Sequence, residues 1–440
     1  MKSTKTIYLL TFLFLSAIQL NAQKLTKKEK RILTHVEKNN EAAITFLEEV
    51  VNINSGTMNT EGVKAVGAIF DAAFQKIGFT TDWKAMPAAM KRAGHLFTEH
   101  KGNKGKRLLL IGHLDTVFEK DSPFQKYENQ DTIALGPGAA DMKGGNIIIL
   151  YALKALYETG LLKDTQIIVA LHGDEEETGK PLTISRKDII DAAKRSDIAL
   201  GFEGSTGFTE ATIARRGSSG WELEVTGKRA HSAGIFSEGD GAGAIFETSR
   251  ILHEFYNELS NIKYLTFNPG IIVGGTFAEY KKDEASGTAF GKTNVIPQTV
   301  KVAGGLRFIS EKQKEDARNT MKGIVAKHLP KTGATIKFWD SYPAMAPTDG
   351  NKKVMEVLSG VSQSLGDGKV TAYDPMKRGA ADISFVAAYT DGIDGLGTMG
   401  EGAHTPEEWI DLRTFEMLTK RAALLIYRLT RATSGNKKGL

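Results

Sequence analysis

The stretch Leu108-Leu-Leu-Ile-Gly-His-Leu-Asp-Thr-Val117 joins a short apolar run directly to a histidine and an aspartate. The four aliphatic residues 108–111 predict a strand that is buried on both faces, as in a parallel sheet covered by helices. His113 and Asp115 follow two residues apart, which places them on one side of an extended backbone. Because ligands of such sheets bind outside the carboxyl ends of the strands, this stretch predicts both a fold class and a site.

The same arrangement recurs downstream, where apolar strands alternate with helical segments and end in acidic residues. The expected strands are 108–111, 166–171 and 198–201, and the expected helices are 27–51, 62–77, 144–157, 184–194 and 412–429. Short apolar strands that alternate with helices predict an α/β domain whose parallel sheet is covered on both faces.

A second unit interrupts this domain near Gly217. Its expected elements are strands at 221–225 and 335–339 and helices at 242–259 and 311–329. The alternating pattern of residues 221–225 predicts a smaller α+β unit with a partly exposed antiparallel sheet. We therefore expect a first catalytic part at 23–213, the smaller unit at 214–340, and a second catalytic part at 341–440.

Residues 1–22 have the layout of a secretory signal peptide, with Lys2 and Lys5 before an apolar stretch and a small residue, Ala22, at the end. An uncleaved anchor is the alternative. The sequence thus predicts a secreted or periplasmic protein, and no later run is apolar enough to predict stable membrane association after leader removal. The chain of 440 residues has no cysteine, which excludes disulfides.

The charge of the chain is close to balanced. The formal net charge is +5, and Lys2 and Lys5 of the leader contribute two of these charges. So small an excess, with the signs interspersed, predicts no nucleic-acid partner.

Carboxylates and imidazoles follow the strands in an order that favours a metal centre. Beside His113, the candidate ligands are Asp141 in a glycine-rich turn, Glu176 and Glu203 at strand ends, and His404 in a later loop. Such residues without cysteine are what two neighbouring catalytic zinc ions need. The ordinary alternatives are a helix cap for Asp141 and a buried, satisfied side chain for His404.

The acidic run Asp174-Glu-Glu-Glu177 stands directly after an apolar strand, where mutual repulsion is costly without nearby positive charge. We assign Glu175 as the general base and Glu176 as a ligand. The alternative register shifts both roles by one residue, to Glu176 and Glu177. Asp115 is placed to accept the other ring N–H of His113 and so to fix its tautomer.

Seven strings in a fixed order carry a resemblance to a known family. They are GHLDTV (112–117), GPGAADMKGG (136–145), DEEETG (174–179), FEG (202–204), GKRAHSAG (227–234), TNVIPQ (293–298) and GEGAHTPEE (400–408). The set resembles the co-catalytic zinc peptidases, the family of glutamate carboxypeptidase, aminoacylase, acetylornithine deacetylase and succinyl-diaminopimelate desuccinylase.

The resemblance implies a fold and a ligand set. The fold is a zinc-peptidase catalytic domain with a mixed, mostly parallel sheet, interrupted by a ferredoxin-like dimerisation or lid domain. Two Zn²⁺ per subunit are implied, with Asp141 bridging them, His113 and Glu203 completing one site, and Glu176 and His404 completing the other. The peptide bond after Asp141 is expected to be cis.

The resemblance also implies groups outside the metal shell. His231 matches an oxyanion donor, and Asn294 and Arg307 match positions that grip the substrate, Arg307 by a bidentate pair with a free carboxylate. Where the family often has an acidic residue two positions before that arginine, this chain has Gly305. Arg378 and Gly379 resemble part of a substrate loop.

These features together predict an exported metallohydrolase that cleaves an amide bond adjacent to a free carboxylate in a peptide or N-acyl amino acid. Glutamate at position 203, rather than aspartate, favours a glutamate-carboxypeptidase-like exopeptidase or an N-acyl-amino-acid deacylase. An aminopeptidase or dipeptidase of the same family and a non-catalytic peptide-binding relative are the alternatives. We expect a homodimer through the smaller unit, and domain closure about hinges near Ile213 and Tyr342.

Overall fold

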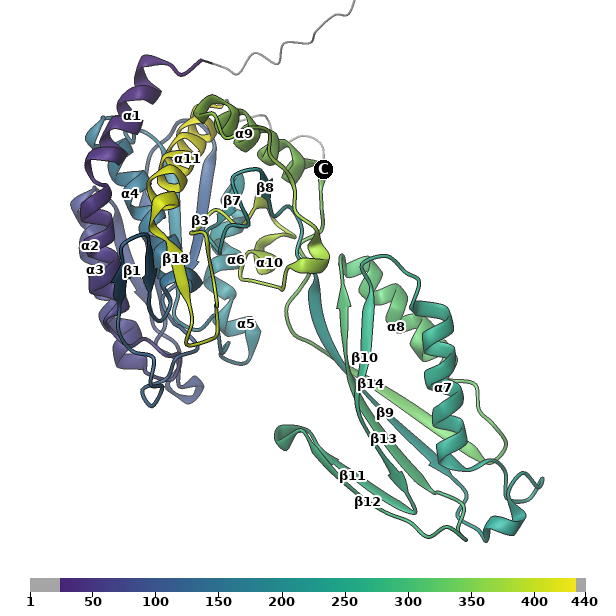
Figure 1. Ribbon diagram of the computed structural model, residues 1–440. Helices are drawn as coiled ribbons and strands as arrows, with labels where there is room; N and C mark the ends of the chain where they lie inside the picture. Colours follow the sequence, from purple (N-terminus) through teal and green to yellow (C-terminus); the bar gives the residue numbers. More distant parts are fainter. Residues whose placement is uncertain (1–23, 433–440) are drawn as a thin grey trace, which may run out of the picture.

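The computed structural model describes residues 24–432, which form a larger and a smaller body (Figure 1). The predicted signal peptide and the residues from 433 onward lie outside the described part. Within 24–432 no helix has the length and apolar character needed to cross a bilayer.

The larger body is built on a six-stranded sheet with the order β1-β2-β6-β3-β7-β16. Its strands are β1 (Thr80–Lys84), β2 (His95–His100), β3 (Arg107–His113), β6 (Gln166–His172), β7 (Ile198–Gly201) and β16 (Asp391–Ile393). Strand β3 pairs in parallel with β6 and β7, and β16 is parallel to β7, whereas β1 and β2 are antiparallel to their neighbours. The expected mixed, mostly parallel sheet is therefore confirmed.

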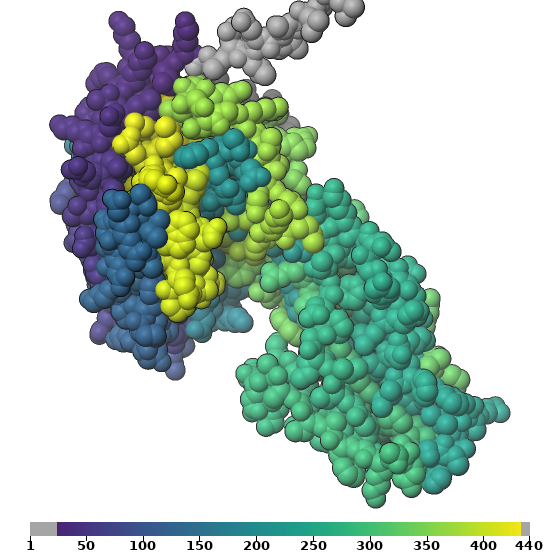
Figure 2. Space-filling model, in the orientation of Figure 1, coloured from purple at the N-terminus to yellow at the C-terminus, as the bar shows by residue number. Residues whose placement is uncertain are grey.

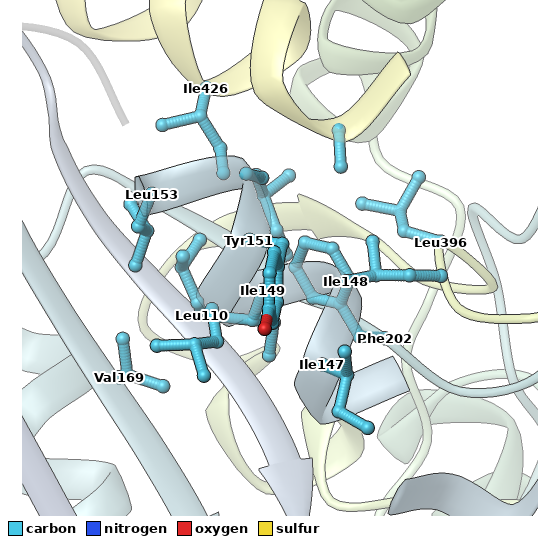
Figure 3. Close-up of a cluster of buried hydrophobic side chains, with 14 of the residues drawn as sticks. Leu110, Ile147, Ile148, Ile149, Tyr151, Leu153, Val169, Phe202, Leu396 and Ile426 are labelled. Atoms are coloured by element: carbon cyan, nitrogen blue, oxygen red, sulfur yellow. The ribbon is translucent and has the colours of Figure 1, made fainter. Parts of the chain in front are cut away.

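Helices cover both faces of this sheet because its strands are apolar on both sides. These helices are α1 (Lys27–Lys38), α2 (Asn40–Val51), α3 (Thr60–Lys76), α4 (Gly144–Glu158), α5 (Leu182–Ser185), α6 (Lys187–Lys194), α9 (Asp349–Leu365), α10 (Ile383–Val386) and α11 (Leu412–Arg431). Leu108 and Leu110 of β3 face one core, with α4 and α11, and Leu109 and Ile111 face another, with α6 and α10. Figure 3 shows α4 at the centre of the first core, where Ile148 and Leu153 lie among side chains of the sheet and α11.

Two expected helices are each divided in two. The helix expected at 27–51 breaks at Asn39, whose side-chain amide donates to the His35 carbonyl (2.7 Å) instead of leaving the backbone to continue the helix. The helix expected at 184–194 breaks at Arg186, which is fully buried and bonded to the acidic loop after β6. In both cases a side-chain contact that periodicity cannot show decides the boundary.

Small strands connect the loops near the carboxyl ends of the main sheet. They are β4 (Glu128–Gln130), β5 (Ile133–Leu135), β17 (Gly400–Glu401) and β18 (Trp409–Asp411) in one sheet, and β8 (Glu210–Ala211) and β15 (Thr371–Ala372) in another. Strand β5 leads into the turn that contains Asp141, and β17 and β18 flank His404. Because β18 pairs with both β17 and β5, the turn that contains Asp141 and the loop that contains His404 lie side by side.

The smaller body is a four-stranded antiparallel sheet with the order β10-β13-β9-β14. Its elements are β9 (Gly217–Gly227), α7 (Gly243–Leu259), β10 (Thr266–Gly275), β11 (Phe277–Lys281), β12 (Ser286–Phe290), β13 (Thr299–Phe308), α8 (Glu311–Val325) and β14 (Thr332–Asp340). Helices α7 and α8 lie on one face and share a separate core with Trp221 and Phe255, while the β11–β12 hairpin lies on the side away from these helices, next to β10 and β13. The space-filling view shows two lobes with a narrow connection (Figure 2).

Candidate metal centre

Asp141 lies between two histidines that are far apart in the sequence. Its Oδ1 is 3.0 Å from Nε2 of His113, and its Oδ2 is 3.1 Å from Nε2 of His404. The two oxygens of one carboxylate thus face different imidazoles, which is the arrangement a bridging ligand requires. The peptide bond between Asp141 and Met142 is cis, as the resemblance implied.

One further carboxylate lies beside each histidine. Glu203 Oε1 is 3.8 Å from Nε2 of His113, and Glu176 Oε2 is 3.2 Å from Nε2 of His404. Ligand atoms of His113, Asp141 and Glu176 all lie within 4.8 Å of one another. The structure therefore brings the five predicted ligands together, and it divides them into the two groups expected for a pair of ions.

The fold explains how residues from so many segments meet. His113 ends β3, the Glu176 loop follows β6, and Glu203 follows β7. These three strands are adjacent and parallel, so their carboxyl ends lie at one edge of the sheet. Asp141 stands before α4, and the sheet of β5 and β18 brings the His404 loop to the same edge.

Asp115 organises the acidic loop as well as the histidine. Its fully buried carboxylate accepts hydrogen bonds from the backbone N–H of Glu175 (3.0 Å) and of Glu176 (3.1 Å) and from the Thr57 hydroxyl (2.7 Å). Nδ1 of His113 lies 3.5 Å from Oδ1 of Asp115 and 3.0 Å from its backbone carbonyl. One side chain thus holds both a ligand histidine and the two residues assigned as base and ligand.

The register of the acidic run follows from the geometry. Glu175 lines the cavity that opens beside the candidate ligands, together with Asp141 and Glu203. Glu177 is instead exposed, and its carboxylate pairs with Arg92 at 2.8 Å on the surface. The geometry favours Glu175 as base and Glu176 as ligand over the register shifted by one.

Glu408 holds the turn that contains Asp141. Its buried carboxylate accepts hydrogen bonds from three backbone N–H groups, those of Gly138 (3.1 Å), Ala140 (2.7 Å) and Asp141 (2.9 Å). Burial raises the pKa of Glu408 to about 7. Glu408 lies four positions after His404 in the string GEGAHTPEE, and neither its residue type nor its position in the sequence predicts this contact with backbone N–H groups.

The electrostatics show that the cluster lacks positive charge. Burial and then the charge of Asp141 raise the pKa of Glu203 to about 8, and burial raises the pKa of Glu175 well above its ordinary value. Hydrogen bonds with Asp141 and Glu176 raise the pKa of His404 to about 10. Raised pKa values of these acids and of His404 indicate that the cluster holds protons where it needs positive charge, so divalent cations fit the site. Carboxylate and imidazole donors suit zinc.

A cavity of about 830 Å³ opens beside the cluster. Arg378 and Gly379 line it, as the substrate-loop interpretation expects, and so does Arg215. Arg215 is buried and bonded to Asp394 (2.7 Å), while Arg378 donates to the Gly204 carbonyl (2.9 Å) and has a buried Nε with no partner among the described residues. Arg378 therefore lines the cavity with one nitrogen bonded to the Gly204 carbonyl and with its Nε enclosed by protein.

The remaining predicted site residues lie on the smaller body and do not line this cavity. His231, Asn294 and Arg307 are all exposed. The segments of the first two are joined, because the Ser232 N–H donates to the Asn294 carbonyl at 3.0 Å and His231 pairs with Val295. The structure thus separates the predicted substrate-gripping groups from the metal ligands by the connection between the two bodies.

The chain is similar to known proteins over most of its length. A model of "Peptidase family M20/M25/M40" matches residues 109–428. Carboxypeptidase G2 from Pseudomonas sp. (strain RS-16) is 29% identical over 397 residues, which cover 88% of this chain and 89% of that protein.

Solved structures share the fold at low identity. Aminopeptidase PepT from Bacillus cereus has a TM-score of 0.68 at 17% identity, over 89% of this chain and 99% of its own. The YXEP protein from Bacillus subtilis, described as a dinuclear metal binding peptidase from the M20 family, has a TM-score of 0.62 at 14% identity, over 90% of this chain and 99% of its own.

Proposed function

Because the chain belongs to peptidase family M20/M25/M40 and is a metallopeptidase-type amide hydrolase, we propose that it holds two Zn²⁺ per subunit and cleaves an amide bond adjacent to a free carboxylate. The observation that carries this proposal is the position of Asp141, with one oxygen facing each of two histidines. The similarity to carboxypeptidase G2 supports a glutamate-carboxypeptidase-like exopeptidase.

The proposed ligands fall into two sets that share Asp141. His113 and Glu203 complete one set, and Glu176 and His404 complete the other. When bound, such a pair of ions lowers the pKa of a water from about 15.7 to around 7 and polarises the scissile carbonyl. The histidines must lose their protons to act as ligands, so we expect metal loading to release protons.

Glu175 is proposed to move the protons of the reaction. It lies in the cavity beside the ligands without an ion pair to a basic side chain in the described part of the chain. A carboxylate in this position takes a proton from the attacking water and gives it to the leaving amine. Asp115 fixes the backbone N–H of Glu175 and thereby its distance from the ligand His113.

The substrate carboxylate has two candidate partners on different bodies. Arg378 lines the cavity, and Arg307 lies on the smaller body with His231 and Asn294. A guanidinium forms two parallel hydrogen bonds with a carboxylate, so either arginine suits this role. For His231 to act as oxyanion donor, the smaller body must close on the cavity or on that of a partner subunit.

We further propose that the protein is a homodimer. Phe236, Ile245, Phe246 and Tyr256 are all large apolar side chains on or beside α7 with 49% to 66% of their surface exposed. A group of exposed apolar side chains on one helix favours a protein interface. Sedimentation across a concentration series tests this, and a monomer with full activity at low concentration contradicts a catalytic role for His231 on a partner subunit.

The decisive experiment measures hydrolysis by zinc-reconstituted protein of a panel of substrates whose amino terminus is either blocked or free. N-acyl and N-blocked dipeptide substrates with a free carboxylate are expected to be cleaved, and their carboxyl amides are not. Cleavage confined to substrates with a free amine would instead identify an aminopeptidase or dipeptidase. Binding of such peptides without any hydrolysis would identify a non-catalytic relative.

Export is proposed from the leader alone. Expression of the full chain and of a version that starts at residue 23 is expected to place only the first outside the cytoplasm, with its amino terminus shortened. Mass spectrometry of the exported form checks the cleavage site, and retention of both forms in the cytoplasm contradicts export.

A further inference from the structure

Tyr342 is the second residue after β14, where the chain returns from the smaller body to the larger one. Its backbone is bound to the outgoing strand β9, because its carbonyl accepts from the Ser218 N–H at 2.8 Å and its N–H donates to the Ser218 hydroxyl at 3.3 Å. The Ser341 N–H donates to the Ser218 carbonyl at 3.2 Å. The backbone of Tyr342 is therefore part of the hinge between the bodies.

The side chain of Tyr342 leaves the hinge and enters the metal centre. Its hydroxyl donates to the backbone carbonyl of Glu175 at 2.9 Å and lies 2.8 Å from the hydroxyl of Thr178. Its ring packs against Phe385 of α10, with ring centroids 4.9 Å apart. This tyrosine thus connects the hinge directly to the acidic loop after β6.

The backbone of Glu175 is held at both ends by different parts of the molecule. Asp115, at the end of the central strand, accepts its N–H at 3.0 Å, and Tyr342 donates to its carbonyl at 2.9 Å. The first contact moves with the sheet and the second with the hinge. Glu175 is thus oriented by one group from the sheet and one group from the hinge.

The buried side chain of Arg186 fixes the rest of the acidic loop. This buried guanidinium donates to the Asp174 carboxylate (2.5 Å), to the Asp174 carbonyl (3.0 Å) and to the Thr178 hydroxyl (3.3 Å). Because these contacts fix the path of the loop, we expect loss of the tyrosine hydroxyl to change the alignment of Glu175 rather than the path of the chain.

We propose that Tyr342 is a positioning residue that aligns Glu175 from the hinge, so that proton transfer depends on the orientation of the smaller body. This inference rests on the proposed function, in which Glu175 is the general base. Through this contact the hinge acts on the base directly. This effect is separate from closure of the smaller body, which would move His231 and Arg307.

The test is Tyr342→Phe in the zinc-loaded, full-length protein. We expect kcat to fall by roughly 10-fold, within the approximately 100-fold that a misplacement of about 1 Å can cost, while KM and zinc content stay near wild type. Tyr151→Phe is the matched control, because it also removes a hydroxyl that donates to a backbone carbonyl, that of Ala42 at 2.9 Å, but in the helical core. The control is expected to keep the wild-type kcat.

Thr178→Val and Ser218→Ala test the two ends of the connection. Ser218→Ala is expected to lower kcat several-fold alone and to have little further effect in the Tyr342→Phe protein, because both changes act through the tyrosine. Thr178→Val also removes a direct hydrogen bond from the Thr178 hydroxyl to the Glu175 carbonyl (3.3 Å), so its effect is expected to add to that of Tyr342→Phe. An unchanged kcat in Tyr342→Phe, a rise in KM alone, or a loss that parallels zinc content overturns the inference. If the wild-type protein hydrolyses no amide, the proposed function fails instead, so the two failures are distinguished.

Discussion

Asp141 sets the spacing of the centre, because each of its oxygens contacts a different imidazole. The residue itself is held by the Glu408 carboxylate through its backbone N–H and those of Gly138 and Ala140. At the residue scale, therefore, the proposed centre consists of a few candidate ligands and of buried carboxylates, such as Asp115 and Glu408, that accept backbone N–H groups.

Replacement of Glu175 by glutamine isolates the proton-transfer step. The amide has nearly the shape of the carboxylate but cannot accept a proton at neutral pH, so kcat is expected to fall by about 10²- to 10⁴-fold. Steady-state kinetics and elemental analysis of the same preparation measure turnover and bound zinc. Full turnover in Glu175→Gln contradicts the assignment of the base.

Replacement of Glu408 by glutamine tests support of the bridging residue. The two carboxylate oxygens of Glu408 accept hydrogen bonds from three backbone N–H groups, whereas a glutamine amide has only one oxygen that can accept. Zinc affinity is therefore expected to fall by about 10- to 100-fold. Titration against a competing chelator gives the affinity. Glu407→Gln is the matched control, since Glu407 is the exposed neighbour, and equal affinities in the two variants would contradict the role of Glu408.

At the scale of elements, the sequence predicted what periodicity and order can reveal. The ends of β3, β6 and β7 were located from apolar runs, and the acids after them follow from those ends. Glu408 and Tyr342 were given no contacts with the centre, because their partners are backbone groups more than 160 positions away. Neither residue type nor spacing records such contacts. The helix breaks at Asn39 and Arg186 have a different cause, because each is decided by a side-chain contact over 4 or 12 positions that periodicity does not show.

The start of α8 offers a test of local stability that leaves the centre intact. Ser310 caps this helix, and its hydroxyl accepts from the Gln313 N–H at 3.1 Å. Ser310→Ala is expected to cost about 1 kcal/mol of unfolding free energy, whereas Ser310→Asn keeps the cap. Denaturant unfolding measures both, and kcat/KM is expected to match wild type. Equal stability of the alanine variant and wild type contradicts the cap.

At the scale of the whole molecule, the proposed cations and the protons of the metal-free cluster would compensate the same buried charge. Glu203 has its folded-state pKa raised from 4.5 to about 8, so the folded apoprotein binds the extra proton and loses stability as the pH rises through that range. His404 has its pKa raised from 6.5 to about 10, so its contribution is complete below 6.5 and is lost as the pH rises through about 10.

Chelation of the metal is therefore expected to cost more stability at high pH. The melting temperatures of zinc-loaded and stripped protein should differ more at pH 9 than at pH 5.5, because the cations replace the protons that the stripped cluster needs. Scanning calorimetry of both forms across this range checks the sign. A gap that narrows as the pH rises would show that the acids are not neutralised by metal.

The two bodies have separate cores, and this makes their roles separable. The core of the smaller body lies within residues 221–344, and the cores of the larger body include none of those residues. The outgoing and returning chains lie side by side at Ser218 and Tyr342. A short glycine linker in place of residues 219–341 is therefore expected to leave a larger body that folds and binds zinc.

That shortened protein is nevertheless expected to lose turnover by at least about 10²-fold, because it lacks His231, and removal of one oxyanion donor costs this much. His231→Ala in the full chain is the comparison, since it removes the same imidazole and keeps the smaller body. Zinc content, circular dichroism and kcat/KM of the two proteins separate folding, metal binding and catalysis. Wild-type turnover in the shortened protein would place the whole reaction in the larger body and would remove any need for closure.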